Sequence, residues 1–453
     1  MAQSGSFASA GDVPGLAWQE IPKSGWRESL LQVRRIRRDM LGVVGERFDR
    51  HGPVVRQSQG PMRMVSLAGP DAARMLLLDR DGIFSAKRSW DLIMGRIFPN
   101  GLLLRDGDEH RHHRRLLREA FRTPALERYL AVMNPMIEQQ LAGLADGSGA
   151  LRTFDHIKSM TLAMACRIFL GLPPEQDTTR MNRAFEAAVA ASMSIVRLPL
   201  PGLEFNRGLQ GRRVMVERLG ALIAERRADG GSDLLAQLCR AVGEDGRPLS
   251  DAEIVDHMIF LMMAAHDTTT STLTSLLYEL AAHPEWQERV RDEVRGFGRP
   301  AIEFGDLLEL PQLIAALQET LRRYPPLSTI PRVCTRSFEW AGCAIPAGVM
   351  VVIYPIHTHH MPTWWSDPFR FDPDRFGPER EEHKRHSHSY IPFGGGNHMC
   401  LGLRFAELQI KAVLFQLLQR YRFRVPAGYR MPVQQAPISK PLDGLPLRFE
   451  RIA

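Results

Sequence analysis

The chain has 453 residues, of which 44% are hydrophobic and 24% are charged, and its formal net charge is +7. This composition supplies enough apolar material for a large core and excludes a disordered or collagen-like chain. No apolar run approaches the roughly 18 residues that a membrane span needs.

The five cysteines and the N-terminus both bear on the compartment. The cysteines are scattered and odd in number, which argues against a disulfide framework and favours a reducing environment. The N-terminus lacks the basic and apolar regions of a signal peptide. We therefore expect a cytoplasmic protein. The cysteines are Cys166, Cys239, Cys334, Cys343 and Cys400.

The pattern along the chain predicts a mainly α protein with a small β portion. We expect residues 1–25 to be a flexible N-terminal segment and residues 26–453 to form one domain. A basic amphipathic helix is predicted over about 26–50, followed by extended stretches at 53–57 and 62–67. Further helices are predicted over 107–121, 124–146, 154–171, 178–194, 208–228, 232–242, 251–282 and 311–324, and a hairpin over 338–355.

Near the C-terminus, a glycine-rich loop places one cysteine just before a helix. Residues 390–402 read YIPFGGGNHMCLG, and an apolar-periodic helix follows to about residue 421. Helix-start amides and the helix dipole favour an anionic sulfur. The glycines remove side-chain bulk where a flat cofactor must lie against the backbone. Thiolate ligation is one recognised way to hold haem iron, so Cys400 becomes the candidate metal ligand.

This loop resembles the haem-binding loop of the cytochrome P450 family, in which Phe393, Gly394, Gly396, Cys400 and Gly402 all match. The resemblance implies a helical fold with short β-sheets that encloses haem b. It also implies iron ligation by the Cys400 thiolate, O₂ as co-substrate and monooxygenase activity.

The predicted helix over 251–282 opens with a capping box, Ser250 to Glu253, and reads AAHDTTT over 264–270. An acid followed by threonines is locally unfavourable in a helix, because these side chains compete for backbone hydrogen bonds. The segment resembles the oxygen-activation segment of the family. That resemblance implies that Ala264 lies over the haem, that Asp267 relays protons and that Thr268 hydrogen-bonds the bound oxygen. The alternative is a polar surface stripe.

Three charged residues resemble the buried ion network of the family. Glu319 and Arg322 lie three residues apart on one helix face, and Arg375 lies in the segment FDPDRF over 371–376. A Glu–Arg pair alone is common on any surface. The resemblance implies that the three residues assemble the haem pocket and take no part in catalysis.

The same resemblance implies that four polar residues bind the two haem propionates. His110 and Arg114 form an i, i+4 pair, Arg332 follows a proline, and His398 lies two residues before the cysteine. Two other histidine clusters, over 357–360 and 383–388, suggest metal sites by composition. They lack the ligand spacing of structural zinc, so we interpret them as solvated loops.

The substrate-contacting stretches can be assigned only by their position in the family. One of them is predicted to be a loop over 90–98, before the basic helix, and it is large and apolar. These stretches predict a sizeable hydrophobic substrate such as a fatty acyl chain, a terpenoid or a steroid. A lid over 195–205 is expected, and Arg96 or Arg197 could anchor a carboxylate. The candidate pocket residues are Leu92, Ile93, Phe98, Met263, Ser328 and Ile330.

The resemblance implies hydroxylation with electrons from a separate ferredoxin or flavodoxin-type donor and its reductase, because this chain carries no flavin or iron–sulfur domain. The basic helix at 110–118 would lie where an acidic donor docks. The alternatives are a peroxide-driven oxidase and a non-catalytic haem protein that binds a gas. A nucleic-acid partner is not expected, because no such motif accompanies the positive charge.

Overall fold

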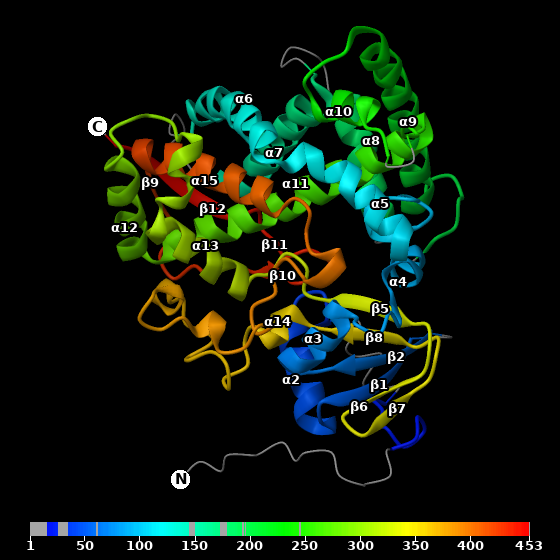
Figure 1. The fold of residues 1–453 in the computed structure, drawn as a ribbon. Coiled ribbons are helices and arrows are strands. Elements are labelled where there is room, and N and C mark those ends of the chain that lie inside the picture. Colours follow the sequence, from blue (N-terminus) through cyan, green and yellow to red (C-terminus); the bar gives the residue numbers. More distant parts are fainter. Residues whose placement is uncertain are drawn as a thin grey trace.

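The computed structural model describes residues 16–25, 35–59, 62–144, 150–172, 179–192, 194, 196–243 and 246–452. A large helical part lies above a smaller part built on a β-sheet (Figure 1). The cysteine loop lies between these two parts, and the helix that follows it, near the C-terminus, belongs to the helical part.

The helices account for most of the described residues. The α-helices are α2 (Met40–His51), α3 (Gly69–Leu78), α4 (Ala86–Met94), α5 (Gly107–Arg118), α6 (Thr123–Leu141), α7 (Thr153–Leu170), α8 (Thr179–Ser192), α9 (Glu204–Asp229), α10 (Leu234–Arg240), α11 (Asp251–Ala282), α12 (Pro284–Arg295), α13 (Pro311–Arg323), α14 (Pro355–Thr358) and α15 (Leu403–Arg420). The 3₁₀-helices are η1 (Leu102–Leu104), η2 (Glu119–Phe121), η3 (Phe304–Leu308), η4 (Pro373–Phe376), η5 (Glu382–Lys384) and η6 (Gly396–His398).

The strands form one larger sheet and three small ones among the described residues. They are β1 (Val54–Gln59), β2 (Met62–Leu67), β3 (Phe84–Ser85), β4 (Leu151–Arg152), β5 (Ile330–Cys334), β6 (Phe338–Trp340), β7 (Cys343–Ile345), β8 (Met350–Ile353), β9 (Tyr421–Arg424), β10 (Val433–Gln434), β11 (Lys440–Pro441) and β12 (Pro446–Arg451).

The larger sheet has the order β1-β2-β8-β5-β3, with a parallel β2–β8 pair between antiparallel neighbours. Strand β8, in the middle of the sheet, is buried along its whole length and reads as a continuous apolar run, MVVI. The predicted hairpin over 338–355 is confirmed in its first half, where β6 pairs with β7. The prediction is wrong for β8, which leaves the hairpin and joins the larger sheet.

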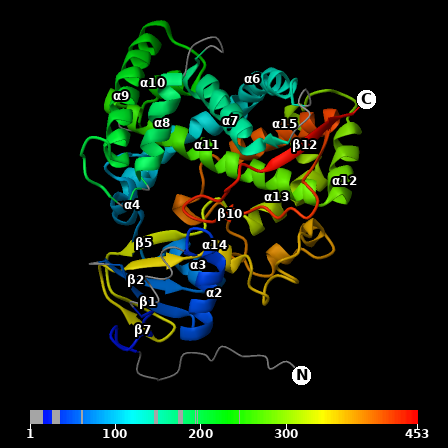
Figure 2. The ribbon, with the colours of Figure 1, turned by 180° about the vertical axis from the view of Figure 1, so that it is seen from behind.

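Helix α11 runs through the middle of the helical part, with α7, α13 and α15 against it (Figure 2). It has 32 residues and is buried along most of its length, as expected for a helix that is apolar on several faces. The predicted capping box is confirmed: the Ser250 side chain accepts from the Glu253 amide, and the Glu253 side chain accepts from the Ser250 amide. One rigid helix therefore presents the 264–270 segment to the interior.

Most predicted helices are confirmed to within a few residues, but α3, α4, α12 and the short α14 were not predicted. Pro70 and Pro284 stand in the first turns of α3 and α12. Proline is favoured there, because its missing N–H would have no partner in the first turn. The described part of the predicted helix over 26–50 holds α2, and residues 26–34 lie outside the described residues.

The expected flexibility of residues 1–25 is wrong for the described part of that segment. The Leu16 amide donates to the Gly342 carbonyl oxygen at 2.6 Å, and Ile21 is buried in the core beside the larger sheet. Residues 1–15 lie outside the described residues. Among the helices that the structure describes, none combines the length and apolarity that a bilayer crossing requires.

Candidate active site

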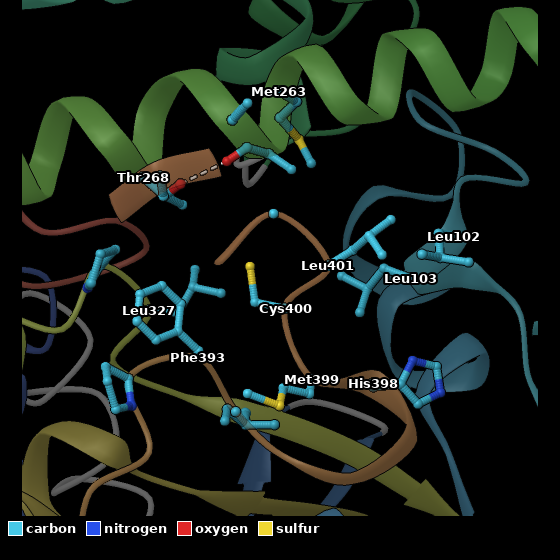
Figure 3. Close-up of a pocket in the computed structure, with 18 of the residues that line it drawn as sticks. Leu102, Leu103, Met263, Thr268, Leu327, Phe393, His398, Met399, Cys400 and Leu401 are labelled. Atoms are coloured by element: carbon cyan, nitrogen blue, oxygen red, sulfur yellow. Dashed lines mark hydrogen bonds between the residues drawn. The ribbon is translucent and has the colours of Figure 1, made fainter. Parts of the chain in front are cut away.

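The Cys400 side chain points into a cavity of about 370 Å³ whose opposite wall is α11. Figure 3 shows the sulfur below α11, with Thr268 and Met263 descending from the helix and Leu102 and Leu103 to one side. A volume in this range is typical of a small-molecule site. The cavity therefore joins the two segments that carried the strongest sequence signals.

Backbone hydrogen bonds fix the shape of the cysteine loop. The Gly394 amide donates to the Ile391 carbonyl oxygen at 3.1 Å, and the Cys400 amide donates to the Phe393 carbonyl oxygen at 3.0 Å. Burial among the surrounding protein raises the pKa of the Cys400 thiol, while the Gly402 amide and the Arg114 charge oppose that rise. Because both opposing groups favour the anion, they would support a thiolate once a metal ion binds it.

Two positions of this loop require glycine for different structural reasons. Gly394 has φ +68° and open space where a Cβ would stand, so its lack of a side chain keeps the cavity wall flat. Gly396 was predicted to contact the cofactor, but it is not among the residues that line the cavity. It has φ +61°, and a Cβ there would lie 1.9 Å from the Leu77 carbonyl oxygen. Gly396 therefore allows the loop to pack against α3.

The four predicted propionate ligands all line the cavity, although they come from α5, β5 and η6. The rings of His110 and His398 lie 4.0 Å apart. Burial, followed by the charge of Arg114, lowers the pKa of His110 to about 4. Burial and the charge of Arg332 lower the pKa of His398 to about 2. Both imidazoles are therefore neutral at pH 7.

The Arg332 guanidinium is a buried cation at this end of the cavity, and the charges of Asp106 and Asp79 only partly offset the effect of burial on its pKa. Burial lowers the pKa of Arg332 to about 10, and its guanidinium donates to the Pro331 carbonyl oxygen at 2.8 Å. The Nε2 atom of His110 is buried without a hydrogen-bond partner among the described residues. Such groups need an acceptor. A flat cofactor with an iron ion for Cys400 and two carboxylates for this end satisfies them all, so the residues fit haem.

The cavity-facing stripe of α11 includes Ala264, Ala265 and Thr268. The Thr268 hydroxyl donates to the Ala264 carbonyl oxygen at 2.6 Å (Figure 3). Asp267 does not line the cavity; its Oδ1 atom lies 3.1 Å from Nδ1 of His266, and its side chain is 18% exposed. The acid thus lies beside the cavity wall and keeps some contact with solvent.

The structure brings three of the six candidate pocket residues to the cavity wall. Ile93, Met263 and Ile330 line the cavity. Leu92, Phe98 and Ser328 do not. Leu92 is 53% exposed near the end of α4, and Phe98 is buried in the helical core. The Ser328 hydroxyl instead donates to the Gln435 carbonyl oxygen at 2.5 Å.

Sequence reasoning missed several lining residues because it treated α4 as a loop. Trp90 and Met94 lie four residues apart on this helix and face the same side, a spacing that would have identified them. The other apolar lining residues that were missed include Leu102, Leu103, Phe260, Leu261, Leu327 and Ile438.

The two arginines considered as carboxylate anchors are occupied elsewhere. The Arg197 guanidinium donates to the carbonyl oxygens of Leu92, Ile93 and Ser192. Arg96 lies over the Phe205 ring, with its guanidinium carbon 4.7 Å from the ring centre. These contacts tie the described part of the 195–205 segment to α4; Ile195 itself lies outside the described residues.

The predicted ion network is present and fully buried. Arg322 donates to both Glu319 carboxylate oxygens at 2.7 and 2.8 Å, and the Arg375 Nε lies 3.1 Å from Glu319 Oε2. Sequence reasoning missed a fourth member, Glu382, which lies 2.9 Å from Arg375. Burial alone would raise the pKa of Glu382, but hydrogen bonds from Arg380 and from the Ser366 amide, with the Arg375 charge, lower it to about 2.

The interpretation of residues 357–360 as a solvated loop is wrong for His359 and His360, which are buried. Burial lowers the pKa of His359 to about 3. The Nδ1 atom of the neutral ring lies 3.2 Å from the Arg322 carbonyl oxygen. Its Nε2 atom accepts a hydrogen bond of 2.9 Å from the Ile391 amide. One imidazole thus connects α13 to the start of the cysteine loop. Among the described residues, no cluster of three or more His, Cys, Asp or Glu side chains could hold a metal ion.

Comparisons with known proteins agree with this site. The family model described as "Cytochrome P450" matches residues 25–442. "Putative cytochrome P450 136" of Mycobacterium tuberculosis (strain ATCC 25618 / H37Rv) is 38% identical to the chain, over 87% of this chain and 81% of its own. "Cytochrome P450 26B1" of Homo sapiens is 29% identical, over 90% of this chain and 82% of its own.

A solved structure described as "Retinoic acid bound cyanobacterial CYP120A1" has the same fold. Its TM-score is 0.85 at 27% sequence identity, and the match covers 92% of this chain and 96% of that one. The family model covers far more than half of the chain, and members of that family bind haem through a cysteine thiolate and use O₂. The chain therefore belongs to the cytochrome P450 family of haem-thiolate monooxygenases.

Proposed function

We propose that this enzyme hydroxylates a sizeable hydrophobic molecule, held between α11 and the cysteine loop, with electrons from a separate donor. The observation that carries this proposal is the character of the cavity wall. Apart from Arg114, Arg332, Glu407 and the two histidines His110 and His398, the described lining residues have no ionisable side chain except Cys400. An apolar wall of this kind favours an apolar ligand.

We infer that Cys400 holds the haem iron and that His110, Arg114, Arg332 and His398 hold its propionates. Bound haem supplies the reductive activation of O₂. The protein contributes a dry cavity, an anionic sulfur and buried cations that orient the cofactor. We further propose that residues 26–453 form the single haem-binding domain, which the family match over 25–442 supports.

We propose that Asp267 and Thr268 move protons into the cavity. Thr268 lines the cavity, whereas Asp267 lies next to it and is partly exposed, so the pair spans from solvent toward the wall. The Thr268 hydroxyl is fixed by its bond to Ala264 and its oxygen can also accept a hydrogen bond. The same pair argues against the peroxide-driven alternative, in which proton delivery to O₂ is not needed.

Replacing Thr268 with alanine tests this relay. General acid–base groups contribute a factor of about 10²–10⁴ to the rate, so we expect the rate of product formation to decrease by a factor in that range. Electrons should then leave as peroxide, so peroxide formed per O₂ consumed is the measurement. Thr268→Ser keeps the hydroxyl and should retain coupling. Thr274→Val, at a buried position of α11 that does not line the cavity, is the matched control. Full coupling in Thr268→Ala would favour a haem protein without a relay.

We propose a terpenoid as the first class to test among the fatty acyl, terpenoid and steroid candidates, because the solved relative is described as bound to retinoic acid. Neither of the two arginines that were candidates to bind a carboxylate group of the substrate is available in this cavity. Arg96 and Arg197 are held by backbone carbonyl oxygens and by Phe205, so neither is placed to anchor an acid.

Titrating the holoenzyme with retinol and retinoic acid tests the substrate class. We expect retinol to shift the Soret band to the blue and to bind at least as tightly as the acid, since no cation meets the carboxylate. Lauric acid and androstenedione serve as fatty-acid and steroid probes. A preference for retinoic acid of more than about tenfold, or about 1.4 kcal/mol, would contradict a neutral pocket.

We propose that a ferredoxin or flavodoxin-type donor docks near α5. Arg111, Arg115 and Arg118 lie exposed on this helix, and Arg114 is close enough to Cys400 to affect its pKa. An acidic partner would be steered to this surface. Reconstituted turnover with each donor type, measured against ionic strength, checks the proposal. The scattered, unpaired cysteines support a cytoplasmic location.

A further inference from the structure

The imidazole of His266 lies inside the protein, directly before the proposed acid of the relay. The residue is 1% exposed, and its ring meets the edge of Phe185 from α8, with 5.8 Å between ring centres and 80° between the planes. No role assigned so far involves this histidine. Its position on α11 nevertheless brings a titratable group against Asp267.

Both ring nitrogens of His266 lie near oxygen atoms, but Nδ1 is buried without a hydrogen-bond partner among the described residues. Nε2 lies 3.2 Å from the Lys158 carbonyl oxygen on α7, and Nδ1 lies 3.1 Å from Oδ1 of Asp267. A carbonyl oxygen can only accept, so Nε2 must carry a proton. In a neutral ring, Nδ1 would then be a buried acceptor only 3.1 Å from a carboxylate oxygen, with no donor of its own. These two acceptors repel unless a second proton lies between them.

We propose that His266 is an imidazolium paired with the Asp267 carboxylate and that it holds a reserve proton for the relay. The proton belongs on the ring because an imidazole is ordinarily a stronger base than a carboxylate. A charged ring donates at both nitrogens, and hydrogen bonds between charged groups are the stronger kind. The pair is neutral overall, which suits its burial. The inference rests on the proposed role of Asp267.

The other charges near this pair compensate each other. On α7 and α8, Lys158 Nζ lies 2.7 Å from Oε1 of Glu186, so that ammonium pairs with a carboxylate other than Asp267. Phe185, from α8, contributes only a ring edge. His266 is therefore the cation that the structure places against Asp267.

The reserve works by one proton transfer. The Nδ1–H bond of His266 breaks, an Oδ1–H bond forms on Asp267, and the ring remains neutral with its Nε2 proton on the Lys158 carbonyl oxygen. Asp267 can then pass that proton on to Thr268. Because Asp267 is partly exposed, a proton from solvent restores the charged ring.

His359 offers a contrast within the same chain. It is also fully buried, but its Nδ1 faces a carbonyl oxygen and its Nε2 faces a backbone N–H, so a neutral ring satisfies both contacts. If the inference is correct, these two buried histidines carry different charges at the same pH. The difference can be measured without turnover.

Nitrogen NMR of the holoenzyme, labelled with ¹⁵N-histidine and studied in its reduced, carbon monoxide-bound form at pH 7.5, tests the charge. The His266 signals are assigned by their loss in His266→Gln. We expect protons on both nitrogens of His266 and on one nitrogen of His359. In Asp267→Asn, His266 should lose its second proton. A neutral His266 in the unaltered protein would overturn the proposal.

Coupling measurements test the reserve role separately. Since His266 acts one step behind the relay, we expect His266→Gln to lower the coupled rate by less than the loss of a direct acid–base group, about tenfold. A charged His266 with unchanged coupling in His266→Gln would overturn the reserve. An Asp267→Asn enzyme that keeps full coupling would overturn the proposed relay, whereas the NMR result would still report the charge.

Discussion

Replacing Cys400 with serine is expected to abolish the absorption band that marks thiolate-bound haem in the reduced, carbon monoxide-treated protein. Cys400 carries the sulfur that the structure directs at the cavity, between the Gly402 amide and Arg114. A hydroxyl in its place is far less readily deprotonated and makes a poor iron ligand. We expect complete loss of the band and of monooxygenase activity. The spectrum of the purified protein is the measurement.

Cys239→Ser is the matched control for this substitution. Cys239 is buried at the end of α10, far along the chain from the cavity loop, and burial raises the pKa of its thiol. Its replacement should leave the spectrum unchanged apart from a modest loss of stability. A Cys400→Ser protein that keeps the thiolate-type band would contradict the ligand assignment.

Replacing Glu319 with glutamine should lower the free energy of unfolding by about 3–5 kcal/mol, the usual effect of removing one partner from a buried ion pair. Glu319 is fully buried, accepts hydrogen bonds from Arg322 and from the Asp372 amide, and forms an ion pair with Arg375 at 3.1 Å. The amide leaves two buried guanidinium groups without this carboxylate. Denaturant unfolding of the holoenzyme, followed by the haem absorbance and by circular dichroism, measures the change.

An exposed pair in the same region provides the control. Arg289 and Asp374 lie 3.0 Å apart, and their side chains are 43% and 56% exposed. Pairs at such positions are worth about 0–1 kcal/mol, so Asp374→Asn should change stability little. Equal effects of the two substitutions would show that the buried network does not stabilise the fold as proposed.

The parts of the site that could be predicted from the sequence are those encoded by residues close together in the chain. The cysteine loop, the Asp267–Thr268 segment and the Glu319–Arg322 pair are each contained within a few residues. Helical spacing or a glycine-rich turn then fixes how their side chains stand relative to one another. That the cysteine loop and Thr268 line one cavity followed from the family resemblance.

The parts that could not be predicted depend on contacts between distant segments. Gly396 matches a family glycine, but glycine is required there because a Cβ would collide with the carbonyl oxygen of Leu77, more than three hundred residues earlier. The role of Glu382 requires the long irregular segment before the cysteine loop to fold back on Arg375. Leu92 was assigned to the cavity because α4 is short and was taken for a loop. In α4, residues 90 and 94 face inward instead.

The shared imidazole of His359 has a consequence for how the enzyme matures. The ring accepts a hydrogen bond from the amide at position 391 and faces the carbonyl oxygen at position 322. We therefore expect the segment that leads to the iron ligand to reach its final conformation only after α13 has packed against it. Cofactor capture should accordingly be a late event on the folding route. A substitution in the charged cluster around α13 would then yield protein without bound haem, even if every residue that contacts the porphyrin is unchanged.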